Sequence, residues 1–173
     1  MDAQNPFSHL DTANNPSMVD VSEKALTRRV ARARSVVTLP ADVMESLSAG
    51  LRETGDILTK KGPVFQTAIL AGTMGAKKTA DLIPLCHPLG LDSCKFTVEA
   101  LGNDVVIECT CTLTARTGVE MEALTGASIA ALTIYDMCKA LSPDIVIRET
   151  RLVEKTGGKK DFVSSQFTVQ GSQ

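Results

Sequence analysis

A hairpin signal in the middle of the chain constrains the fold more than any other feature. Two strand-length runs, 91–101 and 105–115, flank the turn-forming residues Gly102-Asn103-Asp104. Glycine and asparagine readily adopt the backbone conformations of a tight turn, so two such runs around them indicate a pair of antiparallel strands. The chain is therefore predicted to contain an antiparallel sheet.

Helical patterns alternate with further strand patterns on either side of this hairpin. A proline in the first turn and a glycine just past the last turn mark where helices begin and end. The predicted elements are an irregular or partly extended segment at 18–34, a short strand at 35–39, a helix from Pro40 to about Thr54, a second helix from Pro63 that Pro84 ends, the hairpin, a long helix at 118–141 and a last strand at 146–153, which Gly157 and Gly158 end.

This order, with one extra helix, is the split β-α-β-β-α-β pattern. It predicts an α+β, ferredoxin-like subunit whose antiparallel sheet carries helices on one face. The helix predicted at 118–141 is apolar or small almost all round, for example at Ala123, Ala127 and Ile134. A helix of that kind is buried on more than one side. Since one small sheet covers a single side, we expect other subunits to cover the rest in a homo-oligomer.

Length and composition bound the class of protein. The 173 residues, 43% of them apolar, suffice for one core. We expect a single catalytic domain at 18–162, a mobile N-terminal arm at 1–17 and a C-terminal tail at 163–173. The arm has no secretory signal, and the longest apolar run, 123–135, is too short to span a bilayer. These features predict a cytoplasmic protein with no membrane contact.

The aromatic content argues against a nucleic-acid partner. Only 3% of residues are aromatic, Trp is absent and the formal net charge is -2. A surface that stacks bases needs aromatic side chains, and a field that attracts nucleic acid needs excess positive charge. An RNA-binding domain of similar topology would present aromatics on the hairpin strands, where Phe96 is the only one.

The five cysteines predict neither a disulfide framework nor a metal site. Their number is odd and no Cys-x-x-Cys pair occurs. Cys94, Cys109 and Cys111 lie in apolar runs, where free thiols act as small hydrophobic side chains. Cys86 and His87 are neighbours in the sequence and lack the spacing of zinc ligands. We therefore expect reduced thiols, no metal and no cofactor.

Two lysine-containing blocks suit an anion. Lys60 and Lys61 precede the helix that begins at Pro63, where free backbone N–H groups would help them to hold a phosphate. The loop 155–160 is basic and glycine-rich, although it lacks the Walker A spacing. The alternative for both blocks is a set of solvated lysines with no ligand.

A proline-braced loop presents one imidazole. Pro84 and Pro88 stiffen the segment around His87, and a rigid loop suits a positioned acid, base or hydrogen-bond donor. The alternative is a histidine whose hydrogen bonds are satisfied by backbone groups.

Three acidic residues lie at the two ends of the long helix. Thr117 and Glu120 match a capping box, which is the stronger interpretation of Glu120, whereas Glu122 is freer to contact a ligand. Asp136 and Lys139 are three residues apart and share a helix face. Because the helix before them is apolar, we expect this charged pair to interrupt a buried stripe, where charges must be paired or functional. Together these blocks favour acid–base chemistry on an anionic phosphate ester.

At this point the blocks resemble those of the MoaC family, the cyclic pyranopterin monophosphate synthases. The resemblance covers roughly 18–162 and is carried by MVDVS at 18–22, DLIPLCHPL at 81–89, TGVEMEALT at 117–125, ALTIYDMCKA at 131–140 and KTGGK at 155–159. Departures are small: Pro63 stands where many members have an acidic residue, and Arg116 where many have lysine.

The resemblance implies a function. Its substrate would be 3′,8-cyclo-7,8-dihydroguanosine 5′-triphosphate, supplied by a radical-SAM GTP cyclase. A phosphorus–oxygen lyase would convert it to cyclic pyranopterin monophosphate and pyrophosphate in molybdenum cofactor biosynthesis. The family implies a homohexamer, a trimer of dimers, with sites at subunit interfaces.

The resemblance also implies residue roles. The expected catalytic residues are Lys61, His87, Asp136 and Lys139. The expected substrate-binding residues are Arg29, Leu85, Cys86, His87, Glu120, Met121, Glu122 and Lys155. The competing hypothesis is a non-catalytic, oligomeric metabolite-binding module of the same ferredoxin-like fold, which would return its ligand unchanged.

Overall fold

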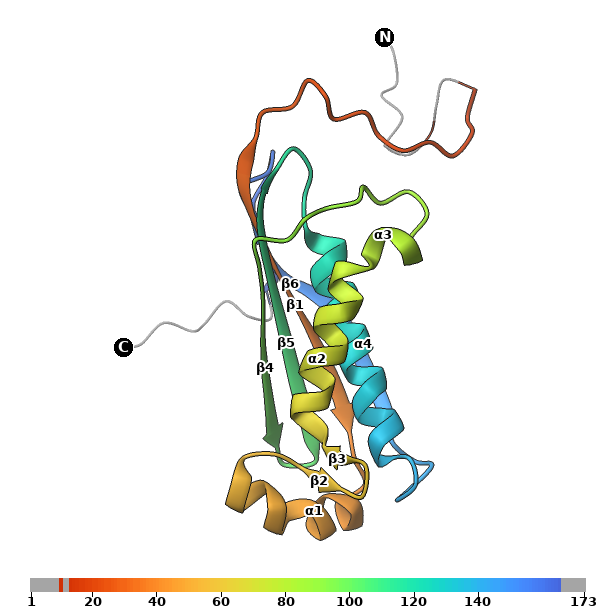
Figure 1. Cartoon of the computed structure of the whole chain (residues 1–173), viewed down its shortest axis with the longest axis vertical. Coiled ribbons are helices and arrows are strands. Elements are labelled where there is room, and N and C mark those ends of the chain that lie inside the picture. The colour runs from red at the N-terminus through yellow and green to blue at the C-terminus, as the bar shows by residue number, and fades with distance from the viewer. Residues whose placement is uncertain (1–9, 11–12, 166–173) are drawn as a thin grey trace, which may run out of the picture.

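The computed structural model describes residue 10 and residues 13–165, and it confirms the predicted α+β, ferredoxin-like architecture (Figure 1). The elements in chain order are β1 (Thr27–Thr38), α1 (Ala41–Thr54), β2 (Leu58–Thr59), β3 (Gly62–Pro63), α2 (Val64–Lys77), α3 (Thr79–Leu82), β4 (Ser93–Leu101), β5 (Asp104–Ala115), α4 (Glu120–Cys138), β6 (Val146–Thr156) and β7 (Phe162–Val163).

The main sheet has the strand order β4-β5-β1-β6-β7, and all neighbouring strands are antiparallel. Helices α2 and α4 lie side by side on one face of this sheet, as predicted, and α1 crosses beneath its lower end (Figure 1). Strand β4 is an edge strand, whereas β1 is paired along both of its sides. The core lies between the sheet and the two long helices.

Strand β1 is longer than predicted. It begins at Thr27, so residues 27–34, predicted to be irregular or partly extended, form a regular part of the strand. The alternation explains this: Ala31 and Ala33 are fully buried under the helices, while Arg32 and Arg34 point to the other face. There both guanidinium groups pair with Glu108 of β5, at 3.1 and 2.8 Å. Cross-strand ion pairs of this kind allow a basic run to lie within a sheet.

The end of the chain is also more ordered than predicted. Strand β6 continues to Thr156, beyond the predicted end at residue 153. The chain then returns, and the short strand β7 pairs with Glu154 and Lys155 of β6. The first residues of the predicted loose tail are therefore held by the sheet. Most of the predicted arm 1–17 and the rest of the tail lie outside the described residues.

Helix α1 confirms its predicted boundaries, and the turn after it caps the next helix. Gly55 ends α1 with a left-handed backbone (φ 71°). The nearly buried carboxylate of Asp56 then accepts hydrogen bonds from the backbone N–H groups of Phe65 (2.7 Å) and Gln66 (3.1 Å) at the start of α2. These donors are therefore not available to a phosphate, which corrects the role expected for that helix end beside Lys60 and Lys61.

Glycines allow α2 and α4 to approach each other closely. A Cβ on Gly72 would lie 2.8 Å from the carbonyl oxygen of Gly126, and a Cβ on Gly75 would lie 2.7 Å from Ile129. Helix α2 thus covers part of the apolar surface of α4 that the sequence assigned to other subunits. The predicted second helix does not run unbroken to residue 82, because a turn at Lys78 separates α2 from the short α3. None of the described helices is long and apolar enough to cross a membrane.

Candidate active site at the two ends of helix α4

The predicted site residues form two groups at opposite ends of α4 (Figure 1). Lys61, Asp136 and Lys139, called here the lysine end, lie where α4 finishes. The remaining candidates surround the start of α4 and are called the pocket end. Glu120 and Asp136 are separated by a helical rise of about 24 Å. One chain therefore does not bring all of the predicted residues together.

The lysine end is a compact ion cluster. The Nζ of Lys61, in the turn between β2 and β3, donates to a carboxylate oxygen of Asp136 at 3.0 Å and to its backbone carbonyl at 2.8 Å. The Nζ of Lys139 lies 2.7 Å from the other carboxylate oxygen. Both ammonium groups also lie near the carbonyl end of α4, where the helix dipole favours positive charge.

The Asp136–Lys139 pair is confirmed, but it is not buried. Each of the two side chains is 55% exposed, because the pair lies on the last turn of α4, past the cover of the sheet. Hydrogen bonds from Lys139 and Lys61 lower the pKa of Asp136 to about 2, and the hydrogen bond to Asp136 raises the pKa of Lys139. At neutral pH the cluster holds two ammonium groups and one carboxylate, with one net positive charge.

An apolar cavity of about 470 Å³ adjoins the lysine end. Leu58 and Leu141 on its wall are each about half exposed in the single chain. Lys60 and Lys61 lie on the same wall. The cavity therefore offers an apolar surface that suits a flat ring and, beside it, lysines that suit a phosphate chain.

The pocket end has two adjoining cavities. The larger, of about 310 Å³, lies between the proline-braced loop and the start of α4. Six of the predicted residues line it: Leu85, Cys86, His87, Glu120, Met121 and Glu122. The smaller, of about 180 Å³, is lined by Arg29, Glu120 and Lys155, and the two cavities share Gly118 and Glu120.

Glu120 binds a lysine instead of capping the helix. Its carboxylate accepts a hydrogen bond from the Nζ of Lys155 on β6 at 2.9 Å. Helix α4 has Val119 at its N-cap position and no side-chain capping bond, so the predicted capping box of Thr117 and Glu120 is wrong. The carboxylate lies against Gly118 and pairs with the cation that β6 places beside it.

Arg29 approaches the smaller cavity from β1. Its Nη2 donates to the carbonyl of Arg116 at 3.4 Å, while its buried Nε has no partner among the described residues. A Cβ on Gly158 would lie 2.8 Å from Nη1, so the glycine leaves room for the guanidinium group. A buried donor that lacks a protein acceptor is costly, and a bound anion would satisfy it.

His87 is held by the backbone, as the alternative interpretation allowed. Its Nε2 lies 2.8 Å from the carbonyl oxygen of Val19, which can only accept, so Nε2 carries the proton. Proton exchange with a ligand would therefore use Nδ1, unless the segment at Val19 moves.

Glu122 is the buried acid of the site. It is 3% exposed, and burial raises its pKa above the ordinary range. Burial also raises the pKa of the Cys86 thiol on the opposite wall, with a further contribution from the charge of Glu122. Carboxyl groups in such surroundings are typical of binding and catalytic sites.

Sequence reasoning identified the basic loop 155–160 but did not select two of its lysines as site residues. Lys159 and Lys160 line the smaller cavity beside Lys155, although only Lys155 was selected from that loop. The pair Gly157 and Gly158 was a usable signal, because the turn there folds the basic loop back over Arg29.

Comparisons with known proteins agree with the residue blocks. The MoaC family model matches residues 18–158. The cyclic pyranopterin monophosphate synthase of Xanthomonas oryzae pv. oryzae (strain MAFF 311018) is 54% identical over 162 residues, covering 92% of this chain and 94% of that protein.

Two longer relatives contain a similar segment. The molybdenum cofactor biosynthesis bifunctional protein of Synechocystis sp. is 49% identical over 90% of this chain and 45% of its own length. The molybdenum cofactor biosynthesis protein 1 of Dictyostelium discoideum is 46% identical over 95% of this chain and 28% of its own length. Because the family model matches most of the chain, this protein belongs to the MoaC family.

Proposed function

We propose that this chain is a cyclic pyranopterin monophosphate synthase. It converts 3′,8-cyclo-7,8-dihydroguanosine 5′-triphosphate to cyclic pyranopterin monophosphate and pyrophosphate, as a phosphorus–oxygen lyase in molybdenum cofactor biosynthesis. The name carried by its relatives supports an enzymatic role. A radical-SAM GTP cyclase supplies the substrate, and the enzyme works in the cytoplasm.

The observation that carries this proposal is the division of the candidate residues between the two ends of α4. The lysine end lacks the buried acid Glu122 and the cations Arg29 and Lys155, and the pocket end lacks the Asp136–Lys139 pair. The lysine end of one subunit therefore completes the pocket end of another, within a homohexamer arranged as a trimer of dimers. Half-exposed apolar side chains beside the lysine end, such as Leu58 and Leu141, support this contact.

Binding rests on the charge of the substrate. A triphosphate carries about four negative charges near neutral pH, and charge-assisted hydrogen bonds to lysine and arginine are the strong contacts for it. Arg29 and Lys155 from the pocket end and Lys61 from the lysine end hold the phosphates. The same cations stabilise the charge that develops on departing pyrophosphate as the α-phosphate closes into the cyclic ester.

Proton transfer is the task of Asp136 and Lys139. In the free chain Asp136 is a weak base because two ammonium groups hold it ionised. When a triphosphate draws Lys61 away, Asp136 loses one of these partners and its basicity rises. Asp136 can then exchange protons with the substrate together with Lys139, while His87 orients the substrate and Glu122 binds the guanine-derived edge.

The test is a single-turnover incubation with the 3′,8-cyclised triphosphate, following pyrophosphate and pterin. The expected result is formation of both products by the native protein and their joint loss in Asp136→Asn, with the oligomer intact. Near-normal turnover in Asp136→Asn would remove Asp136 from the mechanism. Tight binding with the triphosphate recovered unchanged would instead support the non-catalytic binding module.

A further inference from the structure

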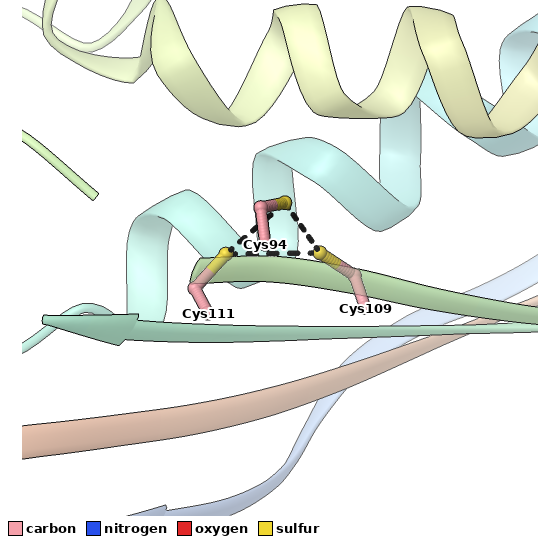
Figure 2. Close-up of side chains that lie close together, drawn as sticks. All are labelled: Cys94, Cys109 and Cys111. Carbon is pink, nitrogen blue, oxygen red and sulfur yellow. Dashed lines mark hydrogen bonds between the residues drawn. The ribbon is translucent and has the colours of Figure 1, made fainter. Parts of the chain in front are cut away.

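Three cysteine thiols meet on the buried face of the hairpin, beneath the first turns of α4. Their sulfur atoms form a nearly equilateral triangle: Cys94 to Cys109 is 3.9 Å, Cys109 to Cys111 is 3.8 Å and Cys111 to Cys94 is 3.7 Å. Figure 2 shows the three side chains converging on a common centre between the hairpin and the helices. The site described above makes no use of this group.

The strand register creates the triangle. Cys94 on β4 pairs directly with Cys111 on β5, and Cys109 lies two residues further along the same face. A Cβ on Gly126 of α4 would lie 2.8 Å from the sulfur of Cys109, so the glycine leaves space for that thiol. Cys109 and Cys111 are fully buried, whereas Cys94 lies on the edge strand and is partly exposed. Cys94 is thus the most accessible member of the group.

The size of the triangle suits a metal ion bound by sulfur. An ion in the plane of three sulfur atoms at these separations lies about 2.2 Å from each, close to metal–thiolate bond lengths of about 2.3 Å. Soft thiolate ligands select Cu(I), zinc or iron–sulfur clusters. Among the described residues, no fourth histidine, cysteine or carboxylate joins the group. Three sulfur ligands without a fourth favour Cu(I), because structural zinc sites are almost always four-coordinate.

We propose that Cys94, Cys109 and Cys111 form a three-coordinate site for a soft, thiophilic cation, with Cu(I) as the ion that fits best. Binding exchanges thiol protons for metal–sulfur bonds and involves no change of oxidation state. The ion enters at Cys94 and links the edge strand β4 to β5. None of the three cysteines is among the residues proposed for the lyase reaction.

Hydrogen bonding already links the three side chains, and the Cys111 thiol donates to the sulfur of Cys94. Because metals bind the thiolate form, binding of the ion must displace the thiol protons. The simpler alternative is three thiols in van der Waals contact that bind nothing.

The test is an anaerobic titration of the reduced, full-length protein with Cu(I) against a colorimetric Cu(I) chelator. The expected result is one equivalent of Cu(I) per chain, with X-ray absorption reporting three sulfur neighbours at about 2.2 Å. Loss of a residue that merely supports a metal ligand typically weakens metal affinity by roughly 10–100-fold. Cys94→Ser removes a ligand itself, so it should weaken the Cu(I) affinity by more than that. Cys138→Ala, which removes a buried thiol elsewhere, should leave it unchanged.

Three results would overturn the proposal. The first is failure of the native protein to take Cu(I) from the chelator. The second is equal binding by Cys94→Ser and the native protein. The third is preferential binding of Zn²⁺ in a parallel titration, which would contradict the assignment to Cu(I). Because Cys94 is partly exposed, its replacement by serine should fold, and circular dichroism of each variant checks this directly.

Discussion

The two ends of α4 are built in opposite ways. At the start of the helix, Glu122 is 3% exposed and Arg29 has a buried nitrogen, and both lie beside closely fitting backbone. At the finish, Lys61, Asp136 and Lys139 project from the molecule with side chains about half exposed. The charges also follow the helix dipole, with glutamates in the first turn and Lys139 just past the last.

Under the proposed function, this difference would separate recognition from chemistry. The pocket end is preorganised, so it can hold a ligand in one orientation at little cost in entropy. The ammonium groups of the lysine end are about half exposed, so a phosphate could reach them and compete with Asp136 for their hydrogen bonds. A site assembled from both ends would combine a rigid wall with movable charge, which explains why each end looks incomplete alone.

The largest expected effect is on catalysis at the lysine end. Lys61→Ala should lower turnover by on the order of 100-fold or more, since one lost donor to developing charge costs about that much. The free energy of unfolding should barely change because Lys61 is exposed. Pyrophosphate release and chemical denaturation measure the two quantities. A dissociated oligomer with poor stability would show instead that Lys61 has a structural role.

The pocket end should respond in stability. Gly157 has φ 83°, and a Cβ there would collide with the carbonyl of Arg28. Gly157→Ala should therefore cost more than the roughly 1–2 kcal/mol of a left-handed backbone alone. Gly55→Ala is the matched control, since Gly55 has φ 71° and open space around it. Equal losses of unfolding free energy in the two variants would contradict the close fit of the basic loop.

Glu122→Gln should lower turnover and raise the free energy of unfolding at neutral pH. Burial raises the folded-state pKa of Glu122, so its contribution to stability is present at low pH and is lost as pH rises through that value. Relative to the native protein, Glu122→Gln should be more stable at neutral pH, and this gain should disappear at acid pH, where Glu122 is protonated; turnover should fall. Glu120→Gln is the control, because it loses the ion pair with Lys155 and should gain nothing. Equal pH dependence in native protein and Glu122→Gln would refute this account of Glu122.

The smallest effect belongs to Asp136 at acid pH. Its folded-state pKa of about 2 lies below the ordinary value of 3.8, so its contribution is present above pH 3.8 and is lost as pH falls toward 2. The native protein should lose slightly more stability over that range than Asp136→Asn. Because the pair is exposed, a large difference would indicate that Asp136 is buried in the oligomer.

Much of the fold follows from patterns in the sequence, and the errors have local causes. The helices that begin after Pro40 and near Glu120 were predictable. Proline and glycine at helix ends and the apolar periodicity between them are features of neighbouring residues. The start of β1 was missed because the basic residues Arg32 and Arg34 resemble a surface segment until Glu108 is placed opposite them. That placement depends on residues more than 70 positions away.

The cluster of Cys94, Cys109 and Cys111 depends on the register in which β4 pairs with β5. The sequence predicted a three-residue turn, Gly102-Asn103-Asp104, which would pair Cys94 with Thr112. The structure has a two-residue turn in which Leu101 pairs with Asp104, so Cys94 lies opposite Cys111. Because side chains alternate between faces, a shift of one residue would place Cys94 and Cys111 on opposite faces. The predicted long helix already separated Glu120 from Asp136, whereas the contacts of Lys61 with Asp136 and of Lys155 with Glu120 join residues far apart in the chain and required the structure.

The shared site between subunits can be tested most directly by mixing two inactive variants. Lys61→Ala damages the lysine end and Lys155→Ala the pocket end. If each site takes one end from each of two chains, a pair of chains contains two sites. About half of randomly formed pairs contain both variants, and in each of these one of the two sites is intact. Co-expressed variants should therefore recover up to about a quarter of native turnover. Recovery near that value would establish a site completed by a second chain. No recovery, in mixed oligomers isolated through two different tags, would contradict it.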